Sequence, residues 1–119
     1  MDGTRVKERT FMFALRIVKL CRFLEEEKKE YVLSKQLLRS GTAIGALVRE
    51  AEHAESRADF IHKMSVALKE ANETEYWIDL LYHSEILEKN GFDSIKPDIV
   101  EILKMLTSIV KSSKKREDS

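Results

Sequence analysis

Carboxylates and histidines recur three residues apart near the middle of the chain. Glu50 is followed by His53, and Asp59 is followed by His62. In helix bundles, a dinuclear metal site takes a Glu-x-x-His pair from each of two helices and a further Glu from each of two others. Here both pairs lie where two predicted helices join, on polar faces, so charged pairs on a solvated surface explain them better. We expect no metal site, no cofactor and no catalytic residues, and hence no enzyme.

The lone cysteine, Cys21, lies in an apolar stretch with no histidine beside it in the sequence. This setting favours an inert core thiol over a nucleophile. A single cysteine cannot form an internal disulfide, which fits a reducing compartment. The first ten residues lack the apolar core of a signal peptide, and no apolar run approaches the ~20 residues that span a bilayer. We expect a cytoplasmic protein that does not enter the membrane.

Glu75 falls inside an apolar stripe of the predicted third helix. A buried carboxylate needs partners, and Arg39, Ser40 and Thr42 of the preceding helix are the plausible donors. The structural interpretation is a polar contact that fixes the register of the two helices. A catalytic carboxylate is the alternative.

Basic residues are unevenly distributed, although the chain holds 21 basic and 21 acidic residues and has a formal net charge of zero. That balance argues against a generic polyanion binder. The basic side chains of the first two predicted helices are nevertheless concentrated on outer faces, and adjacent helices would make them one basic surface for phosphate. An ordinary solvated face is the alternative. The candidate phosphate contacts are Arg5, Arg9, Arg16, Lys19, Arg22, Lys35, Arg39 and Arg49.

Apolar residues recur at spacings of three and four, which predicts an all-α protein. Ser56 is the expected N-cap of the third helix, with Asp59 completing a capping box. Gly91 is its expected C-cap, and Pro97 fits the first turn of the fourth helix. The helices are predicted at about residues 6–29, 33–54, 57–89 and 96–112.

Short connections between these helices predict an antiparallel up-and-down four-helix bundle. Residues 1–112 form a single domain in this prediction, and residues 113–119 form a disordered charged tail.

Two glycines interrupt the apolar pattern of the predicted second helix. Glycine in a helix interior costs about 1 kcal/mol relative to alanine. Gly41 and Gly45 lie four residues apart and therefore share one face, where a second helix could approach closely. Space for a phosphate is the alternative, but no strand precedes the glycines and no P-loop lysine follows them.

The third helix carries a second apolar patch, nearly opposite its core stripe. A single bundle of this size could not cover both, so we expect an oligomer whose second patches meet neighbouring subunits. A monomer with a few exposed apolar residues is the alternative. The predicted interface residues are Val66, Trp77, Leu80 and Leu87.

The stretch between Leu33 and Leu81 carries a set of specific motifs: Arg39-Ser-Gly-Thr-x-Ile-Gly, Glu50-Ala, Asp59-Phe-Ile-His-Lys, Lys69-Glu and Glu73-Thr-Glu-Tyr-Trp. With these motifs the stretch resembles a known family, the small bacterial four-helix-bundle proteins of the 23S rRNA intervening-sequence type. These are related to the accessory variability determinants of diversity-generating retroelements. One departure is Leu47, where the family often has Asn.

The resemblance implies an antiparallel four-helix bundle that assembles into a ring-shaped homopentamer and accompanies RNA or a nucleic-acid-processing protein. It supplies no catalytic residues. We expect a non-enzymatic, homo-oligomeric accessory factor that binds phosphate through its basic face. The alternative is a protein–protein scaffold with no nucleic-acid role.

Overall fold

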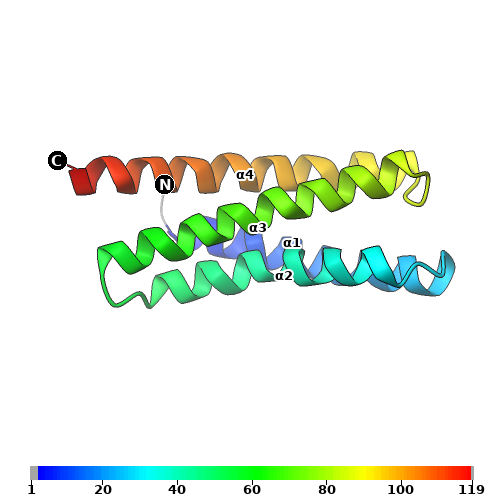
Figure 1. Ribbon diagram of the computed structural model, residues 1–119, viewed down its shortest axis with the longest axis horizontal. Helices are drawn as coiled ribbons and strands as arrows, with labels where there is room; N and C mark the ends of the chain where they lie inside the picture. The colour runs from blue at the N-terminus through cyan, green and yellow to red at the C-terminus, as the bar shows by residue number, and fades with distance from the viewer. Residues whose placement is uncertain (1–2, 119) are drawn as a thin grey trace.

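Four helices make up the fold of the computed structural model, which describes residues 3–118, with side chains from residue 5 to residue 116. No strand occurs in this part of the chain, so the all-α prediction is confirmed. Figure 1 shows the helices lying along one long axis of 50 Å. The elements are α1 (Gly3–Glu27), α2 (Val32–Glu52), α3 (Arg57–His83) and α4 (Lys89–Asp118).

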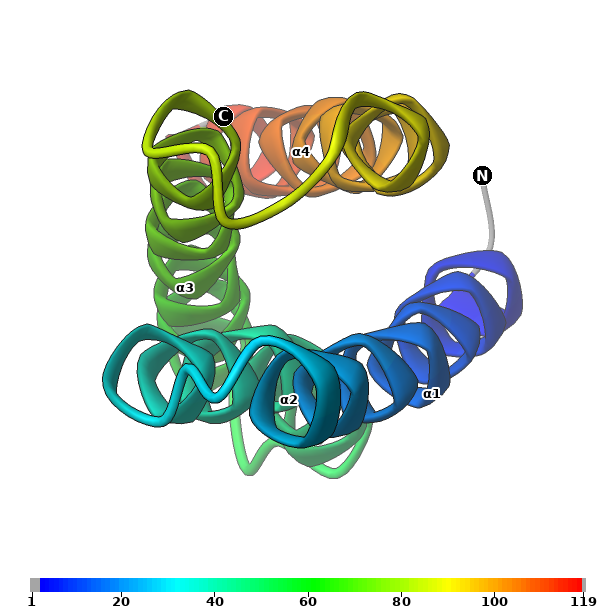
Figure 2. The ribbon, with the colours of Figure 1, turned by 90° about the vertical axis from the view of Figure 1, so that its right-hand side faces the viewer.

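The helices form an up-and-down bundle. Each helix packs against its neighbours in the chain, and α1 also contacts α4 to close the square (Figure 2). Ion pairs between α2 and α3 show the antiparallel direction, since Arg39 pairs with Glu70 while Glu50 pairs with Lys63. The α1–α4 contact is the smallest of the four. In the described part of the chain α1 does not pack against α3, so these two helices stand at diagonally opposite corners of the square (Figure 2).

Aliphatic side chains fill the centre. The amphipathic pattern turns one stripe of each helix inward, and burial of such side chains contributes roughly 1.5–3 kcal/mol each. None of the described helices is both long and apolar enough to cross a membrane. The largest side chains with no measurable exposure include Ile17, Leu24, Leu37, Ile44, Ile78, Leu81, Ile99 and Leu106.

Both glycines of α2 lie where α1 approaches closely, as the sequence predicted. A Cβ at Gly41 would stand 2.9 Å from Cγ2 of Ile17. A Cβ at Gly45 would stand 3.3 Å from the backbone oxygen of Thr10. The missing side chains therefore allow α1 and α2 to pack nearer than larger residues would permit.

Ser56 caps α3 as predicted. Its hydroxyl accepts a hydrogen bond from the Asp59 N–H at 3.0 Å, and the Asp59 carboxylate accepts one from the Glu55 N–H at 3.2 Å. Together these bonds satisfy backbone donors that have no partner inside the helix.

The predicted boundary between the third and fourth helices is wrong. α3 ends at His83, because Glu85 adopts a left-handed φ of 66°. The N–H of Ile86 then donates to the Leu81 carbonyl and that of Glu85 to the Tyr82 carbonyl, which is the hydrogen-bond pattern of a Schellman cap. A glutamate occupies the position that usually holds glycine, so no glycine in the sequence marks this helix end.

Gly91 and Pro97 were consequently misassigned. Both lie inside α4, which begins at Lys89. Gly91 is not a cap; a Cβ there would stand 2.8 Å from Cδ1 of Leu87, which is buried. Pro97 cannot donate a backbone hydrogen bond to the Asp93 carbonyl, yet the helix continues through it.

The far end of α4 also differs from the prediction. Residues 113–118, expected to be a disordered tail, continue the helix to Asp118, and Ser119 lies outside the described residues. Ser113 is buried against the bundle, which ties this last part of the helix to the domain.

Candidate functional site

A hydroxyl pair, and not Glu75, forms the buried polar contact between α2 and α3. Thr74 and Ser40 are both fully buried, and the Thr74 hydroxyl lies 2.9 Å from the Ser40 hydroxyl. Each hydroxyl also has a carbonyl acceptor of its own helix within reach, that of Glu70 at 2.8 Å from Thr74 and that of Leu37 at 3.5 Å from Ser40. The sequence correctly placed a polar contact at Ser40 but assigned its α3 partner one residue too late.

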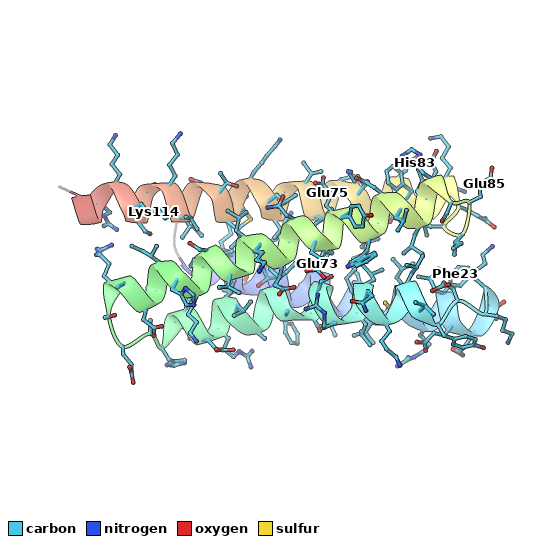
Figure 3. All side chains as sticks on the ribbon, in the orientation of Figure 1. Phe23, Glu73, Glu75, His83, Glu85 and Lys114 are labelled. Atoms are coloured by element: carbon cyan, nitrogen blue, oxygen red, sulfur yellow. The ribbon has the colours of Figure 1, made fainter. Side chains whose placement is uncertain are left out.

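Glu75 points the other way, toward α4. Its carboxylate lies 3.2 Å from the Lys96 ammonium, which also donates to Asp79. Figure 3 shows Glu73 on the α2 side of α3 and Glu75 on the α4 side. Burial lowers the pKa of Lys96, but hydrogen bonds to the two carboxylates outweigh it and the pKa is raised. Glu75 therefore joins α3 to α4 and has no contact with Arg39 or Thr42.

Arg39 also belongs to the α2–α3 contact. Its guanidinium bonds Glu70 at 3.2 Å and Glu73 at closer range. Glu73 accepts a second hydrogen bond from the Trp77 indole N–H at 3.3 Å. Arg39 is thus an ion-paired residue of the helix contact, and is less available to phosphate than the sequence suggested.

Three arginines of α1 reach α4. Arg5 and Arg9 both pair with Glu101. Arg16 pairs with Asp98 and donates to the Ser94 backbone oxygen at 3.1 Å. The carboxylates that pair with these arginines come from α4, at the neighbouring corner of the bundle. These arginines therefore tie α1 to α4 where apolar contact is least.

Four of the candidate phosphate contacts remain unpaired. Within residues 5–116, no carboxylate forms an ion pair with Lys19, Arg22, Lys35 or Arg49, and all four side chains are exposed. The Cys21 thiol lies 3.3 Å from the Ser34 carbonyl oxygen, so the next residues, Arg22 and Lys35, lie at one level of the α1–α2 hairpin. The remaining cations thus belong to the outer faces of α1 and α2.

The predicted interface patch on α3 is only partly exposed. Leu87 lies in the connection after α3 and is 3 % exposed within its own subunit, so it cannot belong to the patch. Val66, Trp77 and Leu80 are half-buried, and Trp77 packs against the core. The neighbouring Tyr76, which the sequence analysis did not select, is 59 % exposed.

The larger exposed apolar surface lies on α1. Phe11, Leu15 and Val18 are spaced four and three residues apart and form one row, with Met12 beside it. Phe11 is 53 % exposed and Met12 is 58 % exposed. Arg22 continues the row four residues beyond Val18. We call Phe11, Met12, Leu15 and Val18 the outer stripe of α1; the apolar breadth of this helix was its signal in the sequence.

The carboxylate–histidine pairs are dispersed on the surface. Glu50 pairs with Lys63, while His53 lies 3.6 Å from the carboxylate of its neighbour Glu52. Among the residues that the structure describes, no three His, Cys, Asp or Glu side chains converge as a metal site would require. Burial, together with the nearby charge of Glu25, raises the pKa of Cys21 to about 12.

These features define a class: a small antiparallel four-helix bundle with a glycine-mediated α1–α2 contact and a buried hydroxyl pair between α2 and α3. The profile of the 23S rRNA-intervening sequence protein family matches residues 3–108, and the chain belongs to that family.

A solved structure is also similar to this chain in both sequence and fold. The 1.70 Å crystal structure of a protein of unknown function from the S23 ribosomal protein family of Bacteroides thetaiotaomicron VPI-5482 is 56 % identical to this chain. The match covers 93 % of this chain and 99 % of that one, with a TM-score of 0.90. No curated protein matches the chain.

Proposed function

We propose that this protein is a non-enzymatic, homo-oligomeric accessory factor that binds RNA through phosphate contacts. The observation that carries the proposal is the outer face of α1 and α2, where an exposed apolar stripe adjoins unpaired cations. Three exposed apolar side chains in one row with a fourth beside it form a contiguous patch, and such a patch favours association, whereas scattered exposed residues would not. The description of the family points to RNA as the polyanion.

The bundle's geometry supports the proposal of head-to-tail self-association. Since α1 and α3 occupy diagonal corners, their solvent-facing sides point in opposite directions (Figure 2). The outer stripe of α1 lies on one side, and Tyr76 with Leu80 lies on the other. Contact between two different surfaces generates a ring when the rotation closes. A ring of five copies is the assembly we propose.

Phosphate binding in this proposal depends on the cations that no carboxylate within residues 5–116 neutralises: Lys19, Arg22, Lys35 and Arg49. A ring repeats each cation in every copy, so a modest charge per subunit becomes an extended basic surface. Each phosphate contact releases counterions and adds to the salt dependence of binding. The contacts are to the backbone, so we expect little dependence on base sequence.

Four other predicted phosphate contacts favour the second candidate, a protein–protein scaffold with no nucleic-acid role. Arg5, Arg9, Arg16 and Arg39 are all paired with carboxylates in the structure. Their pairing leaves the outer stripe of α1 as the dominant surface feature. The two candidates differ in salt response, because an apolar contact survives salt that abolishes phosphate binding.

The test of RNA binding is fluorescence anisotropy with a structured RNA across a salt series. Lys35→Gln/Arg49→Gln should weaken binding and reduce the slope of log K against log salt by about 1–2. Lys69→Gln/Lys104→Gln is the matched control, since it removes two exposed cations from α3 and α4. Absence of binding by the wild type at low salt would favour the scaffold.

Self-association is tested separately by sedimentation velocity. Leu15→Glu places a charge in the outer stripe and should shift the protein toward monomer at micromolar concentration. Thr107→Glu, at an exposed position of α4, should leave the assembly unchanged. An assembly that tolerates Leu15→Glu would show that the outer stripe is not the contact.

A further inference from the structure

Tyr31, in the connection between α1 and α2, is an aromatic residue that solvent reaches freely. Its side chain is 56 % exposed, and within residues 5–116 it takes part in no hydrogen bond, ion pair or ring contact. The other two tyrosines of the chain both have aromatic partners. Tyr76 packs edge to face with Trp77, at 5.1 Å between ring centroids. Tyr82 stacks on Phe92 at 4.1 Å, so only the ring of Tyr31 is left without an aromatic neighbour in this part of the chain.

Capping of α2 does not explain the tyrosine either. Tyr31 occupies the N-cap position, where small polar residues are preferred as acceptors, and its side chain makes no cap hydrogen bond. Glu30 caps the helix instead, since its carboxylate accepts hydrogen bonds from the backbone N–H groups of Leu33 and Ser34. The Glu30 N–H donates to the Leu24 carbonyl oxygen at 3.0 Å, which fixes the connection to α1. The ring therefore projects from a hydrogen-bonded segment.

Two cations flank this position. Lys35 lies four residues after Tyr31, whose backbone is already helical, so both lie on one side of α2. The contact between Cys21 and Ser34 places Arg22 of α1 at the level of Lys35. Both cations are exposed, and no carboxylate within residues 5–116 forms an ion pair with either. An exposed ring between unpaired cations is the combination by which proteins bind single-stranded nucleic acid.

We propose that Tyr31 is a stacking platform for an unpaired base of RNA, and that Lys35 and Arg22 hold the phosphates on either side of that base. This inference rests on the proposed RNA binding and specifies the ligand as RNA with unpaired nucleotides. Every base has a π-face, so stacking tolerates any sequence. A base inside a duplex has both faces covered by its neighbours, so duplex RNA gains the phosphate contacts alone.

The platform is compatible with assembly through the outer stripe of α1. The stripe ends at Val18, one turn before Arg22, whereas Tyr31 belongs to the end of the bundle that faces the viewer in Figure 2. Two exposed acids at this end, Glu26 and Glu27, lie on α1. Phosphates should therefore lie on the α2 side of the ring, where Lys35 stands.

The test compares a short fluorescein-labelled oligouridylate with an abasic oligoribonucleotide of the same length, by anisotropy with the full-length protein. The abasic probe keeps the phosphates and lacks the bases, so the wild type should prefer oligouridylate. Tyr31→Ala should weaken oligouridylate binding about five- to a hundredfold and leave abasic binding unchanged. Tyr31→Phe keeps the ring and should bind as the wild type does. Val32→Ala, at the neighbouring position that is 72 % exposed, is the matched control and should change neither affinity.

Lys35→Gln separates the phosphate contact from stacking. It should weaken binding of both probes and reduce the slope of log K against log salt by about 0.7, whereas Tyr31→Ala should leave the slope unchanged. Circular dichroism melts establish that each variant is folded. Equal wild-type affinity for the two probes, or a Tyr31→Ala variant that binds oligouridylate normally, would overturn the stacking platform while phosphate binding stands. A Tyr31→Phe variant as weak as Tyr31→Ala would overturn it as well. If the wild type binds neither probe nor structured RNA at low salt, both proposals fail.

Discussion

Substitution of Gly41 by leucine tests the close α1–α2 contact most directly. On an isolated helix the change stabilises by about 0.8 kcal/mol, because glycine is the poorer helix former. In this protein the first added atom already stands 2.9 Å from Cγ2 of Ile17, a fully buried side chain. Overpacking of a filled core costs roughly 1–3 kcal/mol. The contact therefore outweighs propensity, and we expect a net loss of about 1–2 kcal/mol.

The assay is thermal unfolding at a fixed protein concentration, since assembly makes Tm depend on concentration. A loss of this size should lower Tm by about 4–10 °C for a domain of this length. Ala46→Leu is the control, because Ala46 is exposed on the same helix five residues later. It should change Tm by far less.

A second substitution identifies the opposing atom. Ile17→Ala alone should cost about 2–5 kcal/mol, because it opens a cavity in the core. Combined with Gly41→Leu, the new side chain occupies that cavity, and the double variant should be more stable than the summed effects by at least ~1 kcal/mol. If Gly41→Leu behaves like Ala46→Leu, or the two effects simply add, the close-packing explanation fails.

Three further predictions concern the hydroxyl pair, the helix boundary and the thiol. Thr74→Val should destabilise by about 0.5–1.5 kcal/mol by removing the hydrogen bond to Ser40, whose hydroxyl keeps the Leu37 carbonyl as an acceptor, and Ser40→Ala should cost less when added to Thr74→Val than it does alone; additive urea-unfolding energies would refute the coupling. Pro97→Ala should raise Tm, because alanine restores the helical donor within α4; if Tm falls, a proline-started helix is the better description. Cys21, whose raised pKa keeps it protonated and whose side chain is buried, should react with a thiol-specific reagent at pH 8 only after unfolding.

Much of the fold could be predicted because its signals are local. Apolar spacing located all four helices, and Ser56 with Asp59 marked the start of α3. The boundary near residue 85 could not be predicted, since the left-handed residue is Glu85 and the glycine nearby serves packing against Leu87. The sequence alone does not distinguish a glycine that ends a helix from a glycine inside a helix that packs closely against another side chain.

The candidate site was harder to predict, because ion pairs between two helices cannot be predicted from the sequence of either helix alone. Glu8 is the one acid between Arg5 and Arg16 in the sequence, yet Arg5 pairs with Glu101 and Arg16 pairs with Asp98, each more than eighty residues away. Similarly, an error of one residue in the phase of α3 exchanged Thr74 for Glu75. One residue rotates a side chain by about 100°, which is enough to move it from the α2 side to the α4 side.

Net charge is therefore a poor guide to the surface of this protein. With a formal charge of zero, an exposed basic face requires that the acids pair unequally with the cations. They do: α4 pairs with Arg5, Arg9 and Arg16 of α1, whereas no carboxylate within residues 5–116 pairs with Lys35 or Arg49. Because the paired arginines hold α1 against α4, replacing them would weaken both fold and any ligand binding. Only substitutions at unpaired cations, such as Lys35 and Arg49, separate a loss of ligand binding from a loss of stability.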